Sequence, residues 1–119
     1  MGDAPARPQP ALALSNAIVG WYAEKFGRGP TRSKTYIDGD HATVILGDVQ
    51  TRVERTLAAH GEESLVKEVR RTVKAIHRAE LSGLVERTTG RAVVAMHSDH
   101  DPGTDTSVYV FLFAGSKTG

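Results

Sequence analysis

The chain has 119 residues, of which 39% are hydrophobic and 24% are charged, and its formal net charge is +1. This length fits one domain with one core, and the near-neutral charge gives no overall field that would attract an acidic partner. The absence of cysteine excludes disulfides, thiolate metal sites and a cysteine nucleophile. No apolar run reaches the roughly 20 residues that span a bilayer, and no secretory signal pattern opens the chain. We therefore predict a cytoplasmic protein.

Three prolines and few apolar residues mark the first ten positions, which predicts a disordered arm over 1–10. A single α+β domain is expected over 11–114, followed by a flexible tail over 115–119. The domain begins with a helix over 11–26, because apolar residues recur there at helical spacing until Gly27. Two runs rich in β-branched residues, 33–37 and 41–46, flank Asp38-Gly39-Asp40, so we expect an antiparallel hairpin.

The middle of the chain is predicted to be helical. Thr51 and Glu54 have the spacing of a capping box, which indicates a short helix that ends near Gly61. A longer helix over 62–88 follows and is amphipathic at 100° per residue. Its apolar side is formed by Leu65, Val69, Val73, Ile76 and Leu84. Its basic side is formed by Lys67, Arg70, Arg71, Lys74 and Arg78.

Two further strands, 92–97 and 106–113, complete the predicted domain. The second is apolar on both faces, which is typical of a strand that lies centrally in a sheet or is covered by a partner. The predicted order is α-β-β-α-α-β-β, and it favours a four-stranded, largely antiparallel sheet with helices packed on one face.

The loop over 97–105 contains the densest set of metal-ligating groups, two imidazoles and three carboxylates. They belong to His97, Asp99, His100, Asp101 and Asp105. One hypothesis is therefore a metal-dependent enzyme or ion sensor. The ordinary alternative is a turn whose aspartates cap their own backbone amides, and the spacing matches no standard metal motif.

Two other features allow a functional and a structural interpretation. The basic side of the 62–88 helix could contact nucleic acid or anionic lipid, but near-neutral total charge favours a solvated face and makes a nucleic-acid partner the weaker hypothesis. Glu80 falls on the predicted apolar side, where a buried carboxylate needs a partner; structural pairing with a basic or tyrosine side chain is favoured over general-base work. No phosphate-loop or nucleophile motif is present.

Several segments, taken in order, resemble the MpsC family over about residues 14–113. They are Ser15-Asn16-Ala17-Ile18, Gly27-Arg28-Gly29-Pro30-Thr31, Lys34-Thr35-Tyr36-Ile37, Thr51 with Glu54, Leu65-Val66, Glu68-Val69-Arg70-Arg71, Glu80-Leu81, Thr88-Thr89-Gly90-Arg91-Ala92-Val93-Val94 and Ser98-Asp99-His100-Asp101-Pro102. The resemblance implies a small soluble bacterial protein of a sodium-translocating, membrane-potential-generating system whose membrane subunits are also linked to inorganic carbon uptake. It supplies no catalytic residues. The candidate ligand or partner positions that it implies are Arg28, Gly29, Pro30, Tyr36, Glu80, Asp99 and Asp101.

Together these observations predict a non-enzymatic accessory or regulatory domain without a cofactor. We expect a homodimer, because the final strand is apolar on both faces. We expect a membrane transport subunit as a partner, which would place the protein peripherally at the inner face of the membrane. Binding is expected through the loops after Phe26 and Met96, or through the basic helix side.

Overall fold

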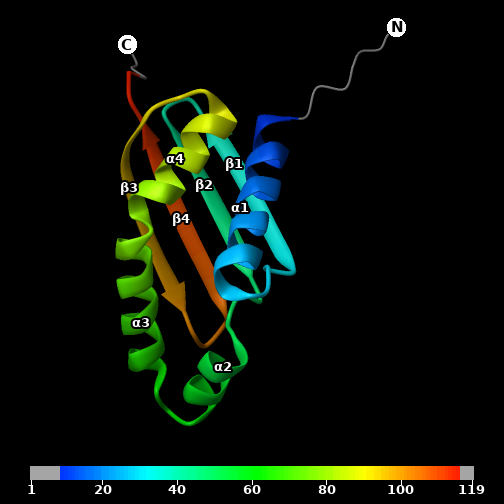
Figure 1. Ribbon diagram of the computed structural model, residues 1–119, viewed down its shortest axis with the longest axis vertical. Coiled ribbons are helices and arrows are strands. Elements are labelled where there is room, and N and C mark those ends of the chain that lie inside the picture. Colours follow the sequence, from blue (N-terminus) through cyan, green and yellow to red (C-terminus); the bar gives the residue numbers. More distant parts are fainter. Residues whose placement is uncertain (1–8, 116–119) are drawn as a thin grey trace, which may run out of the picture.

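The computed structural model describes residues 9–115, so most of the predicted arm and tail lies outside the described residues. The elements in chain order are α1 (Pro10–Phe26), β1 (Arg32–Asp38), β2 (His41–Gly47), α2 (Arg52–Ala59), α3 (Glu63–Ile76), α4 (Arg78–Thr89), β3 (Val93–Asp101) and β4 (Thr106–Phe113). The α+β class and the four-stranded sheet are confirmed. Figure 1 shows α1 and α4 lying across one face of this sheet.

The sheet has the strand order β1-β2-β4-β3, and all three neighbouring pairs are antiparallel. β4 is therefore central, as its doubly apolar sequence predicted. The predicted hairpin also forms, with Asp38 paired to His41 across its turn. β3 continues to Asp101, where it still pairs with Thr106. The expected loop over 97–105 is thus wrong in its first half, because the ladder with β4 extends through residues 97–101.

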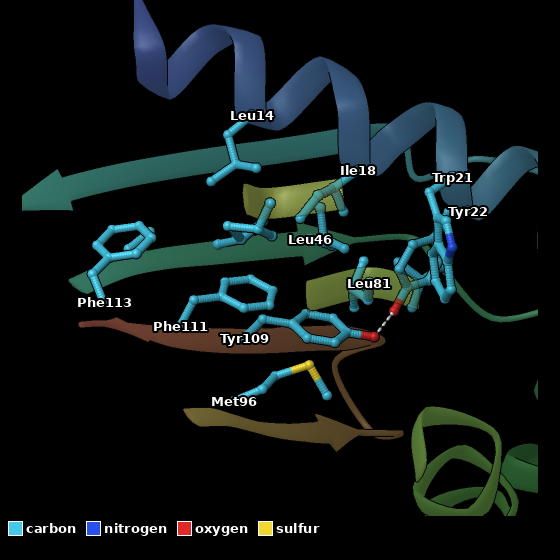
Figure 2. Packing of buried hydrophobic residues seen from close by; sticks show 14 residues of the cluster. Leu14, Ile18, Trp21, Tyr22, Leu46, Leu81, Met96, Tyr109, Phe111 and Phe113 are labelled. Atoms are coloured by element: carbon cyan, nitrogen blue, oxygen red, sulfur yellow. Dashed lines mark hydrogen bonds between the residues drawn. The ribbon is translucent and has the colours of Figure 1, made fainter. Parts of the chain in front are cut away.

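The hydrophobic core lies between the sheet and helices α1 and α4. Figure 2 shows Leu14 and Ile18 of α1 pointing toward Leu46 of β2 and Phe111 of β4. These four side chains have no solvent exposure, and burying a side chain of this size contributes about 2 kcal/mol to stability. Alternate residues of the strands therefore pack against one layer of helices, and no helix within residues 9–115 covers the other face of the sheet.

The long helix predicted over 62–88 is two helices, α3 and α4, which meet at His77. A straight helix of that length would extend about 40 Å, whereas β3, the longest strand, has nine residues and spans about 30 Å. The break at His77 lets α4 pack on α1 while α3 contacts α2 and the end of β3. The His77 ring also packs edge-on against Trp21, with ring centroids 5.6 Å apart.

The predicted apolar side of α3 does not face the core. Leu65 and Val69 are each 42% exposed and Ile76 is 71% exposed, while the buried residues of α3 are Val66 and Arg70. The predicted apolar side is therefore wrong as an inward face for Leu65, Val69 and Ile76, whereas Leu84, which lies in α4, does pack against the core. Because Arg70 points into the interior, α3 is rotated about its axis relative to the predicted orientation, and Leu65, Val69 and Ile76 face solvent.

Thr51 and Glu54 form the predicted capping box at the start of α2. Replacing Thr51→Ala removes the acceptor for the Glu54 amide and is expected to lower the free energy of unfolding by about 1 kcal/mol. Urea denaturation measures this as a lower midpoint at constant slope. Thr72→Ala is the control, because Thr72 is exposed inside α3 and alanine is the better helix former. Equal losses in both variants would contradict the capping role.

Candidate functional site

The loop between β2 and α2, residues 48–51, is the point where polar groups from five other segments meet: the α1–β1 connection, α2, α3, β3 and the β3–β4 turn. Arg28 donates to the carbonyl oxygens of Asp48 and Gln50 at 2.8 and 2.9 Å, and its other nitrogen lies 3.1 Å from Asp48 Oδ2. Asp105 accepts from the amides of Val49 and Gln50, both at 3.0 Å. This loop therefore joins the α1–β1 connection to the β3–β4 turn.

Asp48 and Asp105 have φ angles of 61° and 52°, in the left-handed region that non-glycine residues seldom adopt. The Asp48 amide donates to the Asp105 carbonyl oxygen at 3.0 Å, so each unusual conformation is held by the other segment. Hydrogen bonds from Thr31 and then Arg28 hold the pKa of Asp48 below its usual range. The Asp48 carboxylate therefore holds the side chains of Arg28 and Thr31, whereas the Asp105 carboxylate holds backbone amides of the loop.

Arg70 of α3 and Glu54 of α2 form an ion pair in the protein interior. Arg70 Nε lies 2.8 Å from Glu54 Oε2, Nη2 lies 2.6 Å from Oε1, and Nη2 also donates to the Val49 carbonyl oxygen at 2.9 Å. Burial alone would raise the pKa of Glu54, but the hydrogen bonds from Arg70 and Thr51 keep it below its ordinary value. The guanidinium carbon lies 4.8 Å from the centroid of the Phe26 ring. Arg70 is only 2% exposed, so its predicted place on a basic surface is wrong.

A second buried polar chain joins the same loop to β3 and β4. His100 Nε2 lies 2.9 Å from Gln50 Nε2, and its Nδ1 lies 2.7 Å from the Ser107 hydroxyl. Because an amide nitrogen only donates, Nε2 of His100 accepts and the ring is neutral. Burial, with a further contribution from Arg70, lowers the pKa of His100 from 6.5 to about 4. The imidazole thus serves as a neutral structural group.

The hydroxyls of Tyr22 and Tyr109 are hydrogen-bonded inside the core (Figure 2). Each side chain is 1% exposed, and burial raises the pKa of both phenols. Neither group can therefore act as a proton donor to a substrate from outside. The pair instead fixes the end of α1 against the central strand.

The predicted metal ligands do not converge. His97 and His100 lie on opposite faces of β3, as their exposed and buried states show. Asp101 accepts from the amide and hydroxyl of Thr104 at 3.1 and 2.7 Å. This is an Asx turn, in agreement with the alternative prediction of a turn whose aspartates cap nearby backbone amides. Within residues 9–115, the structure assembles no group of three or more His, Asp or Glu side chains that could hold a metal ion.

Glu80 lies on the surface instead of the apolar side predicted for it. Its carboxylate lies 2.8 Å from Lys25 Nζ and 3.2 Å from His77 Nδ1, and its side chain is 44% exposed. The error comes from the break at His77, which resets the helical phase of every later residue. The structural partner was nonetheless anticipated, and hydrogen bonding to Lys25 lowers the pKa of Glu80.

The remaining candidates divide between packing and surface positions. Pro30 is buried, and a β-carbon added at Gly29 would lie 3.2 Å from the Val19 carbonyl oxygen, so this loop packs closely on α1. Tyr36 is 52% exposed on the open face of the sheet. The sequence indicated Arg28 and Glu54 as notable, but it carried no signal for Gln50, whose role depends on His100 fifty residues away.

The basic residues other than Arg70 gather in a cleft between α3 and β3. Lys67, Arg71, Lys74 and Arg78 line it together with residues 96–100, and its volume is about 280 Å³. Lys67 Nζ lies 3.4 Å from Asp99 Oδ1. The predicted basic side of the helix therefore faces a strand across a hollow.

Replacing Arg70→Met leaves Glu54 buried without its partner and is expected to lower the free energy of unfolding by about 3–5 kcal/mol. Combining it with Glu54→Gln removes the unpaired charge but keeps the capping acceptor, so part of the loss should be recovered. Chemical denaturation measures both. Arg71→Met is the matched control, because Arg71 is exposed on the same helix; an equal loss there would contradict the ion-pair assignment.

Because the folded protein holds the pKa of His100 near 4, the unfolded chain binds a proton that the native state excludes. The contribution of His100 to the free energy of unfolding should be constant above pH 6.5. As the pH falls from 6.5 to about 4, the free energy of unfolding should decrease by roughly 1.4 kcal/mol for each pH unit. Denaturation at pH 7.5 and about pH 5 measures the decline. His100→Gln should remove it and His97→Gln should retain it, whereas the same slope in all three proteins would rule out His100 as its source.

Comparison with known protein families identifies a match over most of the chain. A family model described as "Na+-translocating membrane potential-generating system (MpsC)" matches residues 7–115. No curated protein and no solved structure matches the chain. Among the described residues, no helix combines the length and apolar composition that a membrane crossing requires. The match covers nearly the whole chain, and the protein belongs to the MpsC family.

Proposed function

We propose that the protein is a non-catalytic accessory component of the Na⁺-translocating system for which its family is named, and that it works as a homodimer. The open face of the sheet is the observation that carries this proposal. α1 and α4 cover the opposite face (Figure 1). A dimer would give a membrane subunit two identical docking surfaces on one small protein.

The open face carries an apolar strip across the two central strands. Ile45 of β2 is 36% exposed and Leu112 of β4 is 37% exposed, with half-buried Val108 and Val110 beside them. Tyr36, which is 52% exposed, extends the strip onto β1. A contiguous apolar surface of this kind is characteristic of a protein interface, and packing of two sheets face to face is its usual solution.

The charges at the two edges favour a second copy as the occupant. The strand register places Lys34, Ile45, Val108 and Asp99 in one row across the sheet. If two copies are related by a two-fold axis parallel to the strands, Lys34 of one copy faces Asp99 of the other. Ile45 then faces Val108. The surface is thus complementary to itself, as a two-fold interface requires.

The expected affinity follows from the size of the face. Four strands at 4.8 Å spacing and about 25 Å in length present roughly 500 Å² per copy. The two copies together would bury on the order of 1,000 Å², the lower end for specific interfaces. We therefore expect a dimer that forms at micromolar concentrations.

The accessory role is supported by how the polar side chains are used. Four of the groups that suggested chemistry have structural partners: Asp105 accepts from backbone amides, Asp101 accepts from Thr104, Glu80 pairs with Lys25, and His100 is hydrogen-bonded to Ser107. These four side chains are therefore engaged in the fold. A regulatory protein bound at the inner face of the membrane, beside an ion-transporting subunit, needs surfaces for docking more than a reactive centre.

The dimer is tested by Ile45→Glu, which puts a carboxylate in the centre of the proposed interface. Sedimentation velocity at about 100 µM should show a dimer for the unchanged protein and a monomer for the variant, because a buried unpaired charge is costly. Ile76→Glu is the matched control, since Ile76 is exposed on α3 away from the sheet. It should remain dimeric.

Charge exchange gives a sharper test of the orientation. Lys34→Asp or Asp99→Lys alone should weaken the dimer, and the two together should restore it. A monomer in the unchanged protein at this concentration would refute the homodimer. Dissociation by Ile76→Glu alone would instead place the interface on α3.

A further inference from the structure

The cleft between α3 and β3 has a concentration of positive charge that its surroundings do not balance. Four basic side chains enter it from the helices, and Asp99 is the one carboxylate among the described residues that line it. Asp99 already lies 3.4 Å from Lys67. Among residues 9–115, no carboxylate forms an ion pair with Arg71, Lys74 or Arg78.

Lys74 shows the effect of this crowding. It is half-buried and its ammonium nitrogen lies 5.8 Å from the centroid of the Tyr109 ring. Burial lowers the pKa of Lys74, and repulsion from Arg70, Arg71 and Lys67 adds to the effect against the attraction of Asp99. An anion in the cleft would offset both contributions.

We propose that this cleft is a binding site for a soluble phosphorylated anion that carries two or more negative charges. Arg71 and Arg78 offer planar forks of donors that match the oxygens of a phosphoryl group, and Lys67 and Lys74 add compact positive charges beside them. The volume of about 280 Å³ accommodates one or two phosphoryl groups with a small organic part.

The geometry favours a soluble anion over a membrane surface. A helix that lies in a bilayer interface buries its apolar side in the lipid and keeps its Lys and Arg side chains on the opposite, polar side. In α3 the exposed apolar residues Leu65, Val69 and Ile76 lie opposite Lys67, Arg71 and Lys74 at 100° per residue. Insertion of that apolar side would therefore turn the cleft away from the headgroups.

A nucleic-acid chain fits the cleft less well than a small anion does. Proteins that bind single strands pair a long basic groove with aromatic side chains on which bases stack. The described lining residues include no Phe, Tyr or Trp, and the formal net charge of the chain is only +1. The positive charge is confined to one hollow of limited length.

Inorganic pyrophosphate is the probe that tests the site. Isothermal titration of the full chain at about 50 mM NaCl should give saturable binding at one site, which weakens at about 500 mM NaCl because salt screens the charges. The double variant Arg71→Gln with Lys74→Gln should raise Kd by about tenfold or more, since it removes two charged donors. These side chains are exposed or half-buried, so the variant is expected to fold, and a denaturation curve verifies this.

The matched control is Arg52→Gln with Arg87→Gln, which removes the same charge from exposed helix positions outside the cleft. It should leave Kd within about twofold of the unchanged value. No heat with pyrophosphate at low salt, or an equal loss in the control, would overturn the site. Binding to phosphatidylglycerol vesicles or an oligonucleotide that needs Arg71 and Lys74, and that pyrophosphate does not displace, would assign the cleft to a lipid or a nucleic acid and refute the soluble anion.

Discussion

The buried guanidinium of Arg70 determines where three segments of the protein lie. It binds the Glu54 carboxylate on α2 and the Val49 carbonyl oxygen in the β2–α2 loop, and it packs on the Phe26 ring at the end of α1. An arginine in the interior is tolerated only when such partners surround it. Because each partner comes from a different segment, a shift of α2 would leave a buried charge unpaired, and a shift of either other segment would remove a further contact of the guanidinium.

This constraint also explains the two surfaces of α3. With Arg70 and Val66 turned inward, the helix must present Leu65, Val69 and Ile76 to solvent on one side. The other side directs Lys67, Arg71 and Lys74 toward β3 and forms the basic cleft. An apolar flank and a charged hollow therefore result from one buried interaction, and the stability of that ion pair sets how well both surfaces are defined.

Local patterns in the sequence were sufficient for most of the fold. The capping box at Thr51, the helix end at Gly27 and the hairpin before His41 each depend on residues within a few positions of one another. The orientation of α3 was not accessible in this way. Amphipathic periodicity shows that a helix has two sides, but the inward side here depends on Glu54, sixteen positions from Arg70. Glu80 was misplaced for a related reason, since the break at His77 interrupts the periodicity on which its position was predicted.

The near-zero net charge conceals how unevenly the charges are used. Several carboxylates have structural partners inside the fold. Glu54 neutralises Arg70, Asp105 accepts from two backbone amides, and Glu86 accepts from the amide of Val93 at 2.8 Å. Three of the basic residues on the cleft side have no such partners in the described chain. A chain with fifteen basic and fourteen acidic residues can therefore have a strongly positive cleft, because several of its carboxylates are paired with backbone amides or with Arg70 and lie outside that cleft.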